Sequence, residues 1–141
     1  MKASIAYIVA PLTAYLFAHI IKYILSKPTL RSWRTFFRSG SMPSSHTAVV
    51  TALAVVIFVN EGFSELLAVV AIFSSIVIFD SLVARRSIGE QGRALVRLIE
   101  RSPFAKDPLP RVALGHTPTE VAAGLALGII IGFIVAFFIT K

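Results

Sequence analysis

The sequence predicts an all-α integral membrane protein with four transmembrane helices and an interfacial amphipathic helix between spans three and four. Hydrophobic residues make up 56% of the 141 residues, more than the roughly 45–50% that is usual in soluble domains. The mean hydropathy is +0.81. Apolar stretches that approach the roughly 20 residues needed to span a membrane recur along the chain, and basic residues gather between them. This length and pattern predict a single membrane domain over residues 1–141.

The expected spans are residues 3–25, 44–59, 63–83 and 118–140. In the first span, Lys22 lies near the end, where its side chain can reach the interface, and Pro11 can bend the helix. This stretch is too long for the core of a cleaved signal peptide, so we interpret it as a retained span. The second span is short. A tight turn at residues 60–62 separates it from the third.

The connection between the third and fourth spans predicts an amphipathic helix over residues 88–101. Its residues divide between an apolar and a charged side: Ile88, Leu95, Leu98 and Ile99 against Glu90, Arg93, Arg97 and Arg101. Such a helix suits the membrane interface, although packing against the spans fits the pattern equally well. The row of arginines is interpreted as solvated and lipid-facing.

Lysine and arginine are concentrated in two connections, residues 22–41 and 84–117, while the turn at residues 60–62 has none. The positive-inside rule therefore predicts a multi-pass protein of the cell membrane, with both basic connections in the cytoplasm and both termini outside. The net charge is +7. Because the charges lie between apolar spans, they indicate anionic lipid headgroups as partners and not nucleic acid. The absence of cysteine excludes disulfides and thiolate metal sites.

Polar residues gather at the four helix ends that this topology places on the basic side. They are residues 27–38, residues 43–46, Asp80 with Arg85 and Arg86, and residues 115–120. Two helix N-termini direct free N–H groups towards this layer, and a serine at position 44 or 45 is expected to cap the second span. Arginine and lysine donate charge-assisted hydrogen bonds to phosphoryl oxygens, and histidines can serve as nucleophile and proton donor. The pattern favours phosphate chemistry.

Two strings carry the most specific signal. Residues 39–46 read SGSMPSSH, and residues 115–121 read GHTPTEV. With Asp80 and the following Arg85-Arg86, they resemble the type 2 phosphatidic acid phosphatase superfamily, and most closely its divergent, compact branch of small membrane proteins. The resemblance covers nearly the whole chain. Relative to the ordinary superfamily motifs, Thr35 replaces a proline, Ser45 a glycine and Glu120 an aspartate. The Ser-Arg pair that opens the third motif is missing: Pro110 stands at the position of its arginine, and Arg111 comes one residue late.

The resemblance implies a phosphatase that forms a phosphohistidine and needs neither a metal nor another cofactor. It makes His116 the nucleophile, Glu120 the carboxylate that orients it, and His46 the general acid. The implied phosphate-binding residues are Lys27, Arg34, Ser45, Arg85 and Arg86. Asp80 has no counterpart in the ordinary motifs, so it joins the candidate catalytic residues with its role open. The substrate would be a lipid phosphate or diphosphate monoester; phosphatidic acid, phosphatidylglycerol phosphate and polyprenyl phosphates all fit.

Two other functions remain open. His46, His116, Asp80 and Glu120 could be ligands of a metal-dependent membrane protein. Alternatively, the same basic cradle could hold a lipid headgroup without turnover, as the departures at Thr35, Pro110 and Glu120 allow. Structural interpretations also exist: Thr117 and Glu120 have the spacing of a capping box, and Asp80 can form a salt bridge with Arg85 or Arg86.

Three glycines, Gly124, Gly128 and Gly132, recur every four residues along the fourth span. Such a stripe of small residues lets another helix approach closely, either from the same chain or from a second copy. Because four spans provide little wall around a site, we expect a homodimer through this face. His19, alone in the first span, is interpreted as a packed or hydrogen-bonded residue.

Overall fold

A computed structural model describes residues 2–26, 41–103, 108–109, 112 and 115–140. Its elements are α1 (Lys2–Leu25), α2 (Ser45–Glu61), α3 (Glu65–Phe79), the π-helical turn η3 (Asp80–Ala84), α4 (Arg85–Glu100) and α5 (Pro118–Thr140). The described residues include no strand. The helix α1, the continuous helix from α3 to α4, and α5 are long and apolar enough to cross a membrane, and α2 is a shorter apolar helix. The predicted all-α polytopic membrane fold is confirmed.

Serine caps and one glycine set the ends of α2 and the start of α3. The Ser44 hydroxyl accepts a hydrogen bond from the Thr47 N–H at 3.5 Å, which confirms an N-terminal serine cap on α2. At the other end, Gly62 has a φ of 66° and donates its N–H to the Phe58 carbonyl. Glycine adopts this left-handed conformation without a steric penalty. Ser64 then caps α3, so the chain reverses direction within a few residues.

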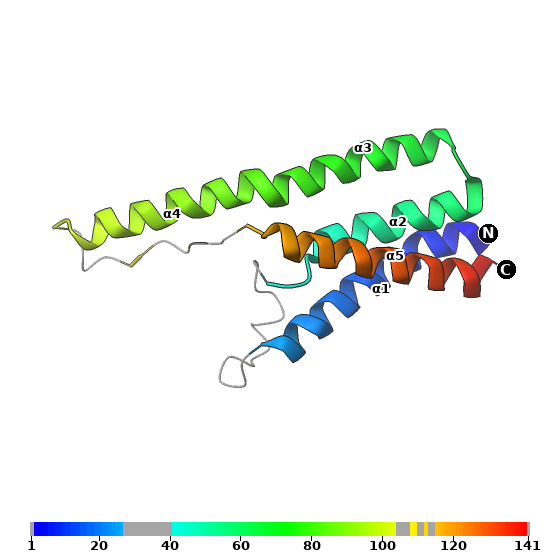
Figure 1. Cartoon of the computed structure of the whole chain (residues 1–141), viewed down its shortest axis with the longest axis horizontal. Helices are drawn as coiled ribbons and strands as arrows, with labels where there is room; N and C mark the ends of the chain where they lie inside the picture. The colour runs from blue at the N-terminus through cyan, green and yellow to red at the C-terminus, as the bar shows by residue number, and fades with distance from the viewer. Residues whose placement is uncertain (1, 27–40, 104–107, 110–111, 113–114, 141) are drawn as a thin grey trace.

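Helices α1, α2 and α5 pack against one another, while α3 contacts α2 on the outside of this trio (Figure 1). Small residues allow the close approach. Four alanines spaced four residues apart on α1 are fully buried: Ala6, Ala10, Ala14 and Ala18. The sequence analysis did not single out this stripe. It is the α1 counterpart of the glycines on α5, and both follow the small-xxx-small pattern of membrane helices.

The glycine stripe of α5 faces α2 of the same chain. A Cβ atom added to Gly128 would lie 2.6 Å from the Ala48 carbonyl oxygen and 2.6 Å from the Thr51 Cβ. One added to Gly132 would lie 2.7 Å from the Val55 Cβ. The expected homodimer stays a prediction. Its expected interface needs correction, however, because α2 already covers the face formed by Gly124, Gly128 and Gly132, so a second copy would have to use another face.

Replacement of Gly128 by valine is expected to destabilise the helix bundle by at least about 1–3 kcal/mol, the usual penalty for overpacking. The new side chain would overlap the backbone of α2, which cannot move aside as a flexible side chain could. Thermal unfolding in detergent measures the effect. The matched control is Ala126→Val on the exposed side of the same helix. Equal melting temperatures for the two variants would contradict the packing described.

The amphipathic segment is helical, and it continues α3 through η3 as one uninterrupted helix, Glu65–Glu100, of 36 residues. No glycine or proline lies between Gly62 and Gly89 to interrupt it. We expected a separate helix in the interface. Instead, α4 takes its direction from α3 and extends beyond the packed helices (Figure 1). Its apolar side chains, such as Ile88 and Leu98, are exposed in the single chain.

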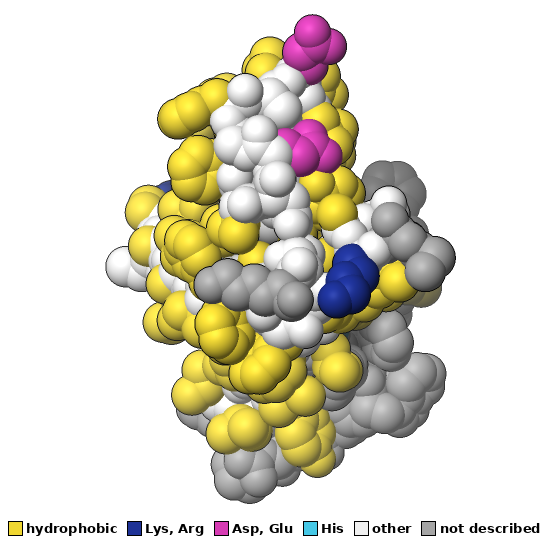
Figure 2. All heavy atoms as spheres, turned by 90° about the vertical axis from the view of Figure 1, so that its right-hand side faces the viewer, with side chains coloured by type: hydrophobic (Ala, Val, Ile, Leu, Met, Phe, Trp, Pro, Cys, Tyr) yellow, Lys and Arg dark blue, Asp and Glu magenta, His cyan; other side chains and the backbone are white. Residues whose placement is uncertain are grey.

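Both termini lie at the same end of the molecule as the turn between α2 and α3 (Figure 1). Viewed from this end, the molecule is covered mainly by apolar side chains, with few charged ones among them (Figure 2). The polar helix ends therefore gather at the opposite end, as the four-span topology predicts. Which end faces the cytoplasm stays a prediction of the positive-inside rule.

Candidate functional site

Three hydrogen bonds connect the polar helix ends to one another. Between α1 and α2, Lys22 Nζ donates to Ser45 Oγ at 3.2 Å. Between α2 and α5, the Ser44 N–H donates to the Glu120 carbonyl at 2.9 Å. Between the segment before α5 and η3, the His116 N–H donates to the Ser81 carbonyl at 3.0 Å. Residues far apart in the sequence thus form one cluster.

Buried His116 and partly exposed Glu120 form a pair at the start of α5. The His116 Nδ1 atom lies 3.1 Å from Glu120 Oε2, and the histidine is 5% exposed. The same carboxylate oxygen accepts the Thr117 N–H at 2.9 Å, and the Thr117 hydroxyl accepts the Glu120 N–H at 3.3 Å. This reciprocal bonding is a capping box. Glu120 therefore caps the helix and also contacts the histidine, so both interpretations of this residue describe real contacts.

Burial lowers the pKa of His116 below its ordinary value, although the hydrogen bond that its ring donates to Glu120 opposes the shift. The imidazole is therefore neutral at pH 7. In the described part of the chain, Nδ1 is the ring nitrogen with a hydrogen-bond partner. A neutral imidazole held through Nδ1 presents the lone pair of Nε2, which is the arrangement that a nucleophilic histidine requires.

Gly115 allows this segment to lie directly against the start of α4. An added Cβ would collide with the Arg86 backbone nitrogen and lie 2.8 Å from the Arg85 carbonyl carbon. The close approach brings the His116 N–H to the Ser81 carbonyl within η3. A π-helical turn at this contact fits the frequent occurrence of such turns at functional sites.

The two arginines at the start of α4 are engaged with carboxylates. Arg85 Nε lies 2.7 Å from Asp80 Oδ2, and Arg86 Nε lies 3.2 Å from Glu90 Oε1. Asp80 thus forms the salt bridge considered from the sequence, and its catalytic role stays a prediction. All four side chains are roughly half exposed. Exposed pairs of this kind are worth about 0–1 kcal/mol, so a ligand can displace them readily.

A small pocket of about 250 Å³ brings His116 and the basic helix together. Its lining residues are Arg86, Glu90, Arg93, Gly115, His116, Thr117 and Glu120. The volume suits a small polar group. Arg93 was assigned from the sequence to a solvated, lipid-facing row, and its place in the pocket depends on the position of Gly115, His116 and Thr117 beside α4.

His46 approaches the same cluster from the first turn of α2. It interacts electrostatically with Arg85, His116, Lys22 and Asp80, and its side chain is exposed. An exposed imidazole beside a second histidine can exchange protons with solvent and substrate. The neighbouring Ser45 is 4% exposed and accepts the hydrogen bond from Lys22. The predicted phosphate ligands Lys27 and Arg34 lie outside the described residues.

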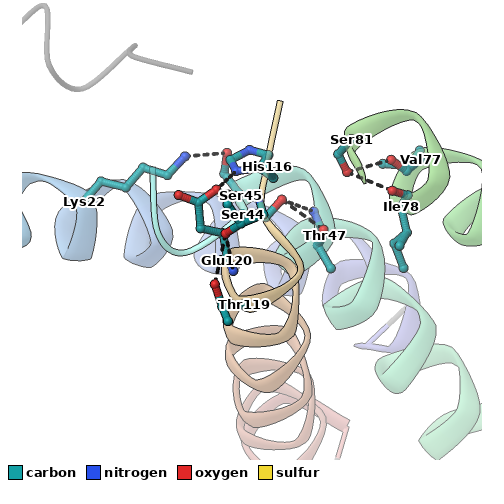
Figure 3. Close-up of polar contacts among 11 residues, drawn as sticks. Lys22, Ser44, Ser45, Thr47, Val77, Ile78, Ser81, His116, Thr119 and Glu120 are labelled. Atoms are coloured by element: carbon teal, nitrogen blue, oxygen red, sulfur yellow. Dashed lines mark hydrogen bonds and ion pairs between the residues drawn. The ribbon is translucent and has the colours of Figure 1, made fainter. Parts of the chain in front are cut away.

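Lys22 is a site residue that the sequence analysis missed, because we interpreted it as reaching towards the interface. It is 4% exposed, and its ammonium group lies within the cluster (Figure 3). A sequence signal existed: Lys22 is the one charged residue within the apolar stretch 3–25. Ionisable residues inside spans are usually functional.

The ligands expected for a metal-dependent protein are not assembled into one set in the described part of the chain. Among these residues, no three histidine, aspartate or glutamate side chains come together as metal ligands would. The two candidate carboxylate ligands have other partners: Asp80 pairs with Arg85, and Glu120 pairs with His116.

Comparison with known proteins agrees with these motifs. No solved structure matches the chain. The chain is 36% identical over 151 residues to YuiD of Bacillus subtilis (strain 168), described as an uncharacterized membrane protein; the match covers 93% of this chain and 94% of YuiD. Residues 4–131 match the model of the Divergent PAP2 family. Since this match spans most of the chain and includes the histidines of both motifs, the chain belongs to the Divergent PAP2 family.

Proposed function

We propose that this protein is a membrane phosphatase that hydrolyses a phosphate or diphosphate monoester of a lipid. One observation carries the proposal: buried His116 and its partner Glu120 line a small polar pocket beside Arg86. A neutral histidine oriented by a carboxylate is suited to attack phosphorus. Membership of the Divergent PAP2 family supports the same class of activity.

The reaction would proceed through two displacements. The His116 Nε2 lone pair forms a bond to phosphorus, the bond from phosphorus to the lipid oxygen breaks, and that oxygen takes a proton from His46. Water then attacks the phosphohistidine and gives up a proton to His46, which releases inorganic phosphate and restores both histidines. Glu120 holds the Nδ1 proton throughout and stabilises the positive charge on the ring.

Charge on the transferred phosphoryl group would be stabilised from two directions. The N-termini of α2 and α5 contribute backbone dipoles, and Ser45 lies in the first turn of α2. Arg85 and Arg86 are close enough to His116 to exchange their exposed carboxylate partners for phosphoryl oxygens. Lys27 and Arg34 remain predicted members of this set. Asp80 would act by holding Arg85 in position.

The position of the site supports a lipid substrate. It lies at the ends of membrane helices, so a lipid can present its headgroup there while its chains remain in the bilayer. The exposed arginines of α4 are suited to anionic headgroups. The positive-inside rule supports a cytoplasmic site in the cell membrane.

Phosphate release from a panel of lipid phosphates tests the proposal. The panel contains phosphatidic acid, phosphatidylglycerol phosphate, a polyprenyl phosphate and a polyprenyl diphosphate, each with and without a chelator. We expect the purified protein to release phosphate from at least one of them, and the chelator to leave the rate unchanged. Binding of these lipids without any phosphate release would identify a headgroup-binding protein instead. Loss of activity with the chelator would support the metal alternative.

A further inference from the structure

The buried ammonium group of Lys22 has fewer partners than it can bind. Lys22 is 4% exposed, and its Nζ donates to Ser45 Oγ at 3.2 Å. An ammonium group has three hydrogens to donate. No carboxylate of the described residues lies within ion-pair distance of it. A buried charge without a counterion is costly, and such groups are normally paired with an anion.

The two arginines at the start of α4 already have anionic partners. Arg85 pairs with Asp80, and Arg86 pairs with Glu90. Each of these arginines must exchange a carboxylate for a phosphoryl oxygen before it can bind substrate. Lys22 needs no such exchange, so a phosphoryl group would supply the counterion that the described residues do not.

Lys22 also lies near both candidate catalytic histidines. Its charge interacts with both His46 and His116, and with Glu120. The side chain extends from α1 towards Ser45, Glu120 and His116 (Figure 3). The Ser45 hydroxyl holds Nζ near the N-terminus of α2, whose free N–H groups also favour an anion.

We propose that Lys22 binds the phosphoryl group directly, with Ser45 positioning its ammonium. This inference rests on the proposed function and deepens it, because it assigns a phosphate-binding role to a buried cation that has no carboxylate partner among the described residues. It also makes α1 part of the site, together with α2, η3 and α5.

Binding of inorganic phosphate tests the inference without requiring turnover. The shift in melting temperature of the purified protein is measured against phosphate concentration at constant ionic strength. Lys22→Met keeps the length and burial of the side chain without its charge, and it should weaken phosphate binding roughly 10- to 100-fold. Lys22→Gln should weaken phosphate binding to a similar extent, and Lys22→Arg should retain part of it. The control is Lys2→Met, at the exposed start of the same helix, which should leave phosphate binding unchanged.

The outcomes separate this inference from the proposed function. Lipid phosphate hydrolysis together with normal phosphate binding by Lys22→Met and Lys22→Gln would overturn the role of Lys22 and leave the phosphatase intact. Lys22-dependent phosphate binding without hydrolysis of any lipid would support the role of Lys22 and contradict the phosphatase. The absence of any phosphate-dependent shift in the wild-type protein would overturn the inference. If Lys22→Met does not fold, the folded Lys22→Gln decides.

Discussion

Replacement of His116 by asparagine is expected to abolish phosphate release and to prevent labelling of the protein by a lipid carrying radioactive phosphate. Asparagine can still donate a hydrogen bond to Glu120 but cannot form the bond to phosphorus. Because the nucleophile is lost outright, the rate should fall by at least about 1,000-fold. The measurements are phosphate release and acid-quenched labelling of the protein. Labelling that persists in this variant would show that another residue attacks phosphorus.

His46→Asn provides the contrasting variant. A general acid contributes about 10²–10⁴-fold to a reaction that needs it, so hydrolysis of a lipid ester should slow by this amount. Formation of the phosphohistidine from an aryl phosphate, whose leaving group needs no proton, should be much less affected, and labelling on His116 should survive. The two substrates are compared by the rate of phosphohistidine formation, because His46 also serves the hydrolysis step that they share. An equal loss for both substrates would contradict the general-acid role of His46.

Replacement of Gly115 by alanine is expected to lower activity by about 100-fold or more, because a displacement of 1 Å in a catalytic group can have this effect. The added Cβ would collide with the backbone of Arg85 and Arg86. The segment would have to move away from η3, which breaks the hydrogen bond from the His116 N–H to Ser81. Turnover is compared with the melting temperature, so that a displaced site can be distinguished from an unfolded protein.

The same substitution at Gly92 is the matched control. There, an added Cβ would meet only side-chain atoms of Val112, at 3.3 Å. These atoms can shift slightly, and alanine also favours the helical conformation more than glycine does. Gly92→Ala should therefore retain most of the activity. Full activity in Gly115→Ala would show that the close approach is not needed.

Much of the fold could be predicted because hydrophobic length alone determines which segments can span a membrane. The helix α5 covers the residues of the predicted fourth span, and α1 begins one residue before the predicted first span. The path of α4 could not be predicted in this way, since amphipathic periodicity does not specify whether a helix bends or continues straight from the one before it. The alanine stripe of α1 was overlooked because alanine is common in all membrane helices.

The parts of the site that lie within one helical turn were accessible from the sequence. The contacts of His116 with Glu120 and of Asp80 with Arg85 join residues four or five positions apart. The contact between Lys22 and Ser45 spans 23 positions and depends on how α1 crosses α2. No pattern within a short stretch of sequence specifies how these two helices cross. A lysine near the end of a span has the same sequence signature whether it turns outward to water or inward to a site.

The long helix also indicates how deep the candidate site would lie in a bilayer. Together, α3 with 15 residues and η3 with five extend about 30 Å at 1.5 Å per residue, which matches the hydrocarbon thickness. The water boundary therefore falls where Arg85 begins α4, beside the backbone that Gly115 contacts. The phosphate of a lipid ester lies in the headgroup layer just outside this boundary. The length of the helix thus places the candidate site near the level of the lipid headgroups. A lipid substrate could therefore diffuse laterally into the site while its chains remain in the bilayer.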